Sequence, residues 1–177
     1  LCSERAEDCP GRMTNAKPEY VLEAVWRQGV PDEAAVARLA ARFAEAVQPP
    51  LVLYLRGDLG AGKTTFARAY IHALGYQGYV KSPSYGLLET YEAGGFNILH
   101  LDLYRIEDPE ELEYLALRDL FDARTVLLIE WPERGAGHLP DADLTLEFGE
   151  NESGRYIACR GTSDHGLAVA RSVYSKT

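Results

Sequence analysis

Apolar residues recur along this chain with two different periods. From Val36 onward they occur at i, i+3, i+4, i+7 and i+11, a spacing that places them on one face of an α-helix. LVLYL (51–55) and TVLLIE (125–130) are instead continuous apolar runs, which are typical of strands buried on both faces of a sheet. The pattern therefore predicts a helix, opened by Pro31-Asp32-Glu33 and ended by Pro49-Pro50, that leads into the first of two buried strands.

Glycine and proline mark the limits of the other predicted elements. The expected helices are 64–74, ended by Gly75, a run from Pro109 to Phe121, and a closing helix at 163–176. The expected strands are an edge strand at 20–28, a hairpin of 85–91 and 96–102 across Gly94-Gly95, and a late hairpin of 144–148 and 155–159. Strands and helices alternate early in the chain, whereas hairpins dominate later. This order predicts an α/β fold with antiparallel additions to its sheet.

Length and composition bear on the number of domains. The chain has 177 residues, of which 46% are hydrophobic, enough for one compact domain with a substantial core. We expect that domain to span residues 19–177, and we interpret 1–18 as a disordered extension or an expression remnant, with the native start at Met13. No apolar run reaches the roughly 20 residues needed to span a bilayer, and the 3 cysteines show no metal or disulfide spacing. These features favour a cytoplasmic protein.

The net charge of the chain is negative. Lys and Arg together number 18 against 27 Asp and Glu, which gives −9. Sequence-independent binding of nucleic acid needs a basic face that displaces counterions, so such binding is not expected. A small phosphate site is still compatible with this charge, because it relies on backbone amides and one lysine.

Residues 57–65, GDLGAGKTT, carry the strongest chemical signal. Gly57-x-x-x-x-Gly62-Lys63-Thr64 matches the phosphate-binding P-loop and lies between a predicted buried strand and a predicted helix, as this motif requires. Its glycines let backbone N–H groups point at phosphates, Lys63 reaches the β and γ oxygens, and Thr64 binds Mg²⁺. The predicted nucleotide-binding residues of this loop are Asp58, Leu59, Gly60, Ala61, Gly62, Lys63, Thr64 and Thr65. The expected fold is therefore a P-loop NTPase-like three-layer α/β/α fold with a mixed sheet.

A P-loop site also needs a carboxylate at the end of a neighbouring buried strand. Two predicted strands end in one, ILHLD at Asp102 and TVLLIE at Glu130. The second run is the more continuously apolar, so Glu130 is our first choice for Mg²⁺, and Asp102 is assigned to the attacking water or a mobile loop. With Lys63 they form the predicted catalytic set. Ser84 in SPSY (82–85) adds a hydroxyl where nucleotide-sensing loops often lie, although a Ser-Pro turn is more often only a turn.

These motifs occur together in one known family. GDLGAGKTTFARA, ALG, VKSPSY, HLDLYR, DPEELE, LIEWPE and LPDADL follow one another in this chain between about Pro31 and Phe148. In this order and spacing they closely resemble the TsaE family, the P-loop ATPases of bacterial tRNA N6-threonylcarbamoyladenosine (t6A) biosynthesis. HLDLYR and IEWPE beside a P-loop are specific to that family.

The resemblance implies a function that the motifs alone do not. It implies a Mg²⁺-dependent ATPase, of low activity alone, that acts through a heterodimer of the threonylcarbamoyl-transferase TsaD and its paralogue TsaB. That complex modifies adenosine 37 of ANN-decoding tRNAs, so tRNA would be reached only indirectly.

Further site residues are also implied by the resemblance. It places Glu33 near the nucleotide base and Trp131 at the mouth of the site, and it suggests Arg155, in a loosely matched region, as a weaker nucleotide contact. The family usually has threonine where this chain has Ser84. The hydroxyl is kept at this position, but a role that depends on packing of the methyl group is lost.

Other functions are compatible with a P-loop. A small kinase that phosphorylates a metabolite would need an acceptor pocket and usually an arginine-bearing lid, and no arginine-rich lid segment is evident. A GTPase would need an Asn-Lys-x-Asp sequence, which the chain lacks, so adenine is the expected base and ATP the expected nucleotide. A nucleotide sensor without hydrolysis stays open. His100 and Asp102 lie two residues apart on one predicted strand. We prefer to interpret His100 as a structural histidine and not as a functional one.

Overall fold

Residues 25–175 are described by the computed structural model of this chain. The extension expected at 1–18 and the native start expected at Met13 lie outside the described residues, as does the first part of the strand expected at 20–28. The rest of that strand is present as β1 (Trp26–Gly29) at one edge of the sheet.

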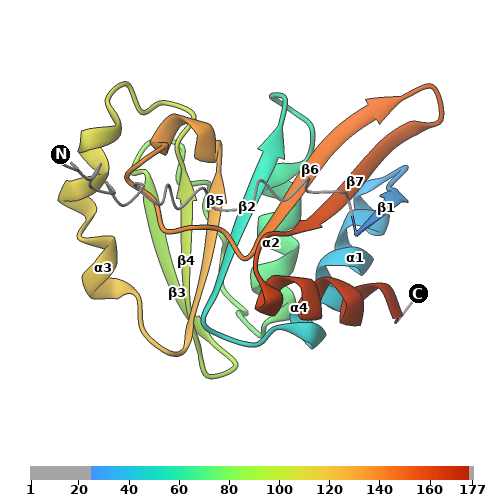
Figure 1. The fold of residues 1–177 in the computed structure, drawn as a ribbon, viewed down its shortest axis with the longest axis horizontal. Helices are drawn as coiled ribbons and strands as arrows, with labels where there is room; N and C mark the ends of the chain where they lie inside the picture. Colours follow the sequence, from blue (N-terminus) through green and yellow to red (C-terminus); the bar gives the residue numbers. More distant parts are fainter. Residues whose placement is uncertain (1–24, 176–177) are drawn as a thin grey trace, which may run out of the picture.

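Within residues 25–175, seven strands form one mixed sheet in the order β1-β7-β6-β2-β5-β4-β3 (Figure 1). After β1 the strands are β2 (Leu51–Gly57), β3 (Leu88–Ala93), β4 (Phe96–Asp102), β5 (Thr125–Glu130), β6 (Leu144–Asn151) and β7 (Gly154–Gly161). The central strands β6, β2, β5 and β4 are parallel neighbours. β1, β7 and β3 add antiparallel pairs toward the edges. Both predicted hairpins and the two predicted buried strands are confirmed, and so is the mixed α/β sheet.

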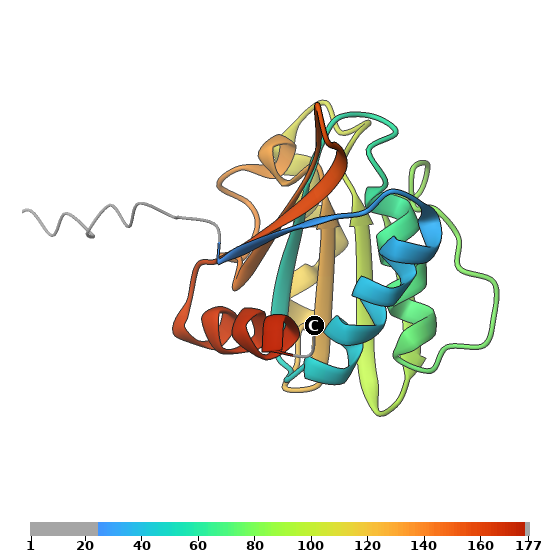
Figure 2. The same cartoon turned by 90° about the vertical axis from the view of Figure 1, so that its right-hand side faces the viewer.

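The longer helices share one apolar core with the sheet. They are α1 (Glu33–Ala46), α2 (Lys63–Ala73) and α4 (Asp164–Ser175). Two of them, α1 and α2, lie side by side (Figure 2). The apolar positions that predict α1 are buried there, and the ring of Phe43 meets the ring of Phe66 on α2 edge-on, with centroids 5.7 Å apart. Asp32 caps α1 by accepting a hydrogen bond of 2.7 Å from the N–H of Ala35. Within residues 25–175, no helix combines the length and apolar character needed to cross a membrane.

Shorter segments cover the opposite face of the sheet (Figure 1). They are a 3₁₀ helix at Pro109–Leu115, the short helix α3 (Leu117–Leu120) and a second 3₁₀ helix at Pro132–Gly135. Leu112 and Leu117 from these segments pack with Leu99, Leu127 and Ile129 in a second, smaller core. β5 is therefore buried on both faces along its whole length, as its continuous apolar run predicts, whereas Arg56 at the end of β2 is exposed.

The continuous helix expected from Pro109 to Phe121 is wrong. The 3₁₀ helix ends at Leu115, Ala116 takes a left-handed conformation with a φ of 47°, and α3 follows. Leu112 and Leu117 are both buried. In one α-helix, five residues rotate a side chain by about 140° beyond a full turn, so these two leucines would not face the same sheet. The break at Ala116 allows both to do so.

The residues directly before β3 form a turn, although the sequence predicted that the strand would already begin there. β3 begins at Leu88 and not at residue 85, because the N–H of Leu87 donates to the carbonyl oxygen of Pro83 (2.8 Å) and closes a turn. Leu87 has a φ of 63°, and its carbonyl oxygen accepts a hydrogen bond of 3.1 Å from the N–H of Asp102. Residues 82–87 therefore lie beside the carboxyl end of β4, next to a predicted site residue.

Candidate functional site

The predicted phosphate loop joins the carboxyl end of β2 to the start of α2. Gly60 and Gly62 have φ angles of 78° and 106°, in the left-handed region that favours glycine. Gly57 has no room for a side chain, because a Cβ atom there would lie 2.4 Å from the carbonyl oxygen of Phe148 on β6. The glycines of the motif are thus needed by both the backbone of the loop and its packing against the sheet.

Lys63 is buried beneath this loop, with 4% of its surface exposed. Its Nζ donates to the carbonyl oxygens of Gly57 (2.6 Å) and Asp58 (2.8 Å) and lies 4.1 Å from the centre of the Trp131 ring. Burial lowers the pKa of Lys63 from its ordinary value, and nearby carboxylates, that of Glu130 foremost, act in the opposite direction. The ammonium group is therefore held by neutral carbonyls and an aromatic face, with acidic groups close by.

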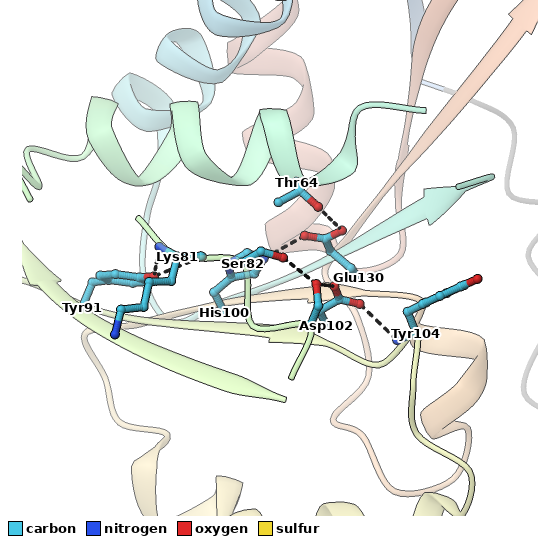
Figure 3. Close-up of polar contacts among 9 residues, drawn as sticks. Thr64, Lys81, Ser82, Tyr91, His100, Asp102, Tyr104 and Glu130 are labelled. Atoms are coloured by element: carbon cyan, nitrogen blue, oxygen red, sulfur yellow. Dashed lines mark hydrogen bonds and ion pairs between the residues drawn. The ribbon is translucent and has the colours of Figure 1, made fainter. Parts of the chain in front are cut away.

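The two predicted carboxylates are neighbours at one end of the sheet. Asp102 and Glu130 are paired in register at the ends of the parallel strands β4 and β5, and both are buried. Oε2 of Glu130 accepts a hydrogen bond of 2.8 Å from Oγ1 of Thr64, in the first turn of α2 (Figure 3). The hydroxyl of the P-loop and the carboxylate chosen for Mg²⁺ are therefore in direct contact.

Asp102 connects the site to the loop that precedes β3. Its Oδ2 accepts a hydrogen bond of 3.0 Å from Oγ of Ser84. Its Oδ1 accepts one of 3.0 Å from the N–H of Tyr104 (Figure 3). The hydroxyl oxygens of Ser82 and Ser84 are 2.6 Å apart. Ser84 thus contacts a predicted functional acid and does more than close a Ser-Pro turn.

A pocket of about 210 Å³ lies between these side chains. The predicted site residues that line it are Leu59, Gly60, Gly62, Lys63, Thr64, Thr65, Ser84, Asp102, Glu130 and Trp131. Asp58 and Ala61 belong to the same loop but are not among the lining residues. Glu33 and Arg155 are exposed and are not among the residues that line the pocket. They share the P-loop end of the sheet, and their contact with the base stays a prediction.

Trp131 lies over the pocket in an uncommon backbone conformation. It directly follows β5 and has a φ of 58°, which is rare for a bulky residue and occurs mainly where the surrounding structure enforces it. Its ring is 5.1 Å from that of Tyr104, and the guanidinium of Arg134 lies 5.3 Å from the Tyr104 ring. The sharp turn after Glu130 therefore places an aromatic side chain against Lys63, at the edge of the site.

The residues around the pocket fit magnesium and a chain of phosphates. Thr64 and Glu130 present hydroxyl and carboxylate oxygens, and Mg²⁺ is usually held by one or two carboxylates together with substrate phosphates and water. Within residues 25–175, no group of three or more His, Cys, Asp or Glu side chains could hold a metal ion by itself. A site completed by phosphate oxygens agrees with this donor set, and Lys63 supplies the positive charge that phosphates need.

Tyr104 was not predicted as a site residue, and His100, interpreted as structural before functional, contacts a predicted site residue. Tyr104 lines the pocket and binds Asp102 through its backbone, and its place two residues after Asp102 was the available signal. His100 is fully buried, with Nε2 at 2.9 Å from Oε1 of Glu130. Its alternation with Asp102 did indicate that both side chains share one face of the strand.

This sheet, loop and pocket define the chain as a P-loop-type α/β protein. A solved structure supports the fold: the crystal structure of YdiB from Bacillus subtilis superposes with a TM-score of 0.73. That match covers 89% of this chain and 98% of YdiB at 24% sequence identity, so it bears on the fold alone.

The chain belongs to the TsaE family. The family model described as "Threonylcarbamoyl adenosine biosynthesis protein TsaE" matches residues 30–157. The tRNA threonylcarbamoyladenosine biosynthesis protein TsaE of Haemophilus influenzae is 44% identical over 135 residues, which cover 73% of this chain and 85% of that protein. Its namesake from Bacillus subtilis is 40% identical over 122 residues, 68% of this chain and 74% of that protein. These matches confirm the resemblance seen in the motifs, and they assign the chain to a family of tRNA threonylcarbamoyladenosine biosynthesis.

Proposed function

We propose that this chain binds and hydrolyses ATP with Mg²⁺ and that this activity serves t6A synthesis on tRNA. The observation that carries the proposal is the convergence of Lys63, Thr64, Asp102 and Glu130 on one pocket beside the phosphate loop. These residues come from α2, β4 and β5, and they supply the cation, hydroxyl and carboxylates that phosphoryl transfer to water requires.

Each side chain around the pocket has a different role in the proposed hydrolysis. Lys63 exchanges the carbonyl oxygens of Gly57 and Asp58 for phosphate oxygens when the nucleotide binds. Thr64 and Glu130 would hold Mg²⁺, which would supply positive charge to the phosphoryl oxygens. Asp102 orients the attacking water and accepts its proton.

Two features support ATP and a loop that responds to it. Glu33 and Arg155 lie at the same end of the sheet as the phosphate loop, where they would contact the adenine base. Ser84 donates a hydrogen bond of 3.0 Å to Asp102, so residues 82–87 would respond if that acid contacted the γ-phosphate. Such a segment is expected to differ between ATP and ADP states.

The proposed partners are the TsaD–TsaB heterodimer and, through it alone, tRNA in the cytoplasm. The net charge of −9 disfavours direct phosphate-backbone contacts, which need a basic surface. The 3₁₀ helix at Pro109–Leu115 adds the exposed side chains of Glu110, Glu111 and Glu113, which suit a basic surface on a protein partner. Family membership supports this assignment, because the relatives are named for the same modification.

The catalytic part of the proposal is tested by phosphate release from ATP. We expect slow release that requires Mg²⁺ and stops in EDTA, and ATP affinity measurable by calorimetry. A protein that binds no ATP would contradict the proposal. Formation of ADP without phosphate release, only after a metabolite is added as phosphate acceptor, would instead identify a kinase.

The partner part is tested by capture of purified TsaD and TsaB on the immobilised chain. We expect stronger retention with ATP than with ADP, and little tRNA bound by the chain alone at physiological salt. Saturable tRNA binding by the isolated chain, insensitive to nucleotide, would overturn this part of the proposal.

A further inference from the structure

A histidine is buried directly behind the carboxylate that is proposed to hold the metal. His100 lies on β4 and is fully buried. Its Nε2 is 2.9 Å from Oε1 of Glu130, while Oε2 of the same carboxylate accepts the hydrogen bond from Thr64 at 2.8 Å (Figure 3). Each oxygen of Glu130 therefore has one partner of its own, one from the P-loop helix and one from the neighbouring strand.

The surroundings of His100 offer its ring little else to bind. Ile98 lies on the same face of β4 as His100, and Leu128 on β5 is paired in register with His100. Both residues belong to the main apolar core. Among residues 25–175, Nδ1 has no hydrogen-bond partner. Because an ionised carboxylate can only accept, Nε2 of His100 is assigned as the donor to Oε1 of Glu130.

Burying a polar side chain at this core position costs free energy of folding, and a leucine would not have this cost. The only polar contact made by the His100 ring within residues 25–175 is the bond to Glu130. We propose that His100 is a positioning residue, which fixes the rotamer of Glu130 so that Oε2 stays available to the metal beside Thr64. This inference rests on the proposed function, because it requires Glu130 to hold Mg²⁺. Partners behind a metal ligand often control its orientation and thereby the affinity of the site.

The proposal makes His100 important for metal binding but not for nucleotide binding as such. It does not line the pocket, so removing its N–H leaves the phosphate loop and Lys63 unchanged. What changes is the freedom of the Glu130 carboxylate to rotate away from Thr64. A purely structural histidine would instead affect stability and all ligand affinities together.

Two amide substitutions separate these roles. In His100→Gln the side-chain amide reaches the position of Nε2 and keeps a donor for Glu130. In His100→Asn the amide ends near the position of Nδ1, so the donor is withdrawn while polarity is retained. ADP affinity is measured by calorimetry for both variants and the natural chain, first in EDTA and then across a Mg²⁺ titration.

We expect His100→Asn to keep its affinity for ADP in EDTA and to need about 10- to 100-fold more Mg²⁺ for half-saturation. His100→Gln should restore the natural Mg²⁺ dependence. An unchanged Mg²⁺ requirement in His100→Asn, or equal losses in both variants, would overturn the inference. If the natural chain itself shows no Mg²⁺-dependent ADP binding, the proposed function fails instead.

A measurement on the natural chain covers the case in which His100→Asn does not fold. ¹⁵N spectra of the histidine rings report which nitrogen carries the proton. The inference predicts a proton on Nε2 of His100 that stays there when Mg²⁺ and ADP bind. A ring whose only proton is on Nδ1 would contradict it, because Nε2 would then have nothing to donate to Glu130.

Discussion

Replacing Glu130 by glutamine should abolish most ATP hydrolysis but lower the free energy of unfolding only slightly. The amide has the shape of the carboxylate, and its oxygen can still accept from Nε2 of His100. Its NH₂ group can donate to Oγ1 of Thr64, because a hydroxyl both donates and accepts. What Glu130→Gln removes is the negative charge of a side chain that is 2% exposed.

The effect on stability follows from the two hydrogen bonds that reach this carboxylate. A bond to a charged group contributes about 1.5–3 kcal/mol and a neutral one about 0.5–1.5 kcal/mol. Weakening both bonds therefore lowers the free energy of unfolding by no more than about 2 kcal/mol, since removing a buried charge also relieves its desolvation. For a chain of this size that corresponds to a decrease in Tm of about 4–8 °C.

The effect on turnover should be larger than the effect on stability. Removing one group that stabilises charge in a transition state typically costs about 100- to 1000-fold in rate, or about 2.7–4 kcal/mol. We therefore expect phosphate release by Glu130→Gln to fall by about 100-fold or more. The affinity for ATP in EDTA should stay close to that of the natural chain, because Lys63 and the phosphate loop are untouched.

Asp102→Asn is the matched control for this experiment. Asp102 is also buried and also accepts two hydrogen bonds, from Ser84 and Tyr104, so its loss of stability should be similar. We expect slower turnover but an unchanged Mg²⁺ requirement, because this acid acts on water. Natural turnover in Glu130→Gln, together with a lost Mg²⁺ dependence in Asp102→Asn, would show that the two roles are reversed.

Other substitutions test the remaining parts of the site. Lys63→Ala removes the cation proposed to hold the β and γ oxygens, so ATP affinity measured by calorimetry should fall at least about tenfold; unchanged affinity would refute the P-loop assignment. Ser84→Ala breaks the bond to Asp102 and should lower phosphate release while the free energy of unfolding drops by no more than about 1 kcal/mol; natural activity would reduce this segment to a turn. Gly57→Ala places a Cβ atom 2.4 Å from the carbonyl oxygen of Phe148, so urea unfolding should show a loss of about 2 kcal/mol or more, and natural stability would contradict the packing described for this loop.

The sequence alone determined the parts of this protein that depend on local pattern. The apolar run of β5 is continuous because both faces of that strand are covered, and the period of α1 marks one buried face. The phosphate loop is recognisable because its glycines meet local backbone demands, such as the φ of 106° at Gly62, and because Lys63 follows directly. Those signals are read from a few adjacent residues and need no knowledge of the rest of the chain.

Tertiary structure decided the features that depend on contacts between distant segments. The break at Ala116 arises because Leu112 and Leu117 must both reach the same sheet face, which local helix propensity opposes. The bond between His100 and Glu130 joins residues 30 positions apart, and it exists because β4 and β5 are parallel neighbours in one particular register. Strand order and register are set by the packing of the whole sheet, so no single segment of the sequence specifies which polar side chains will meet at its edge.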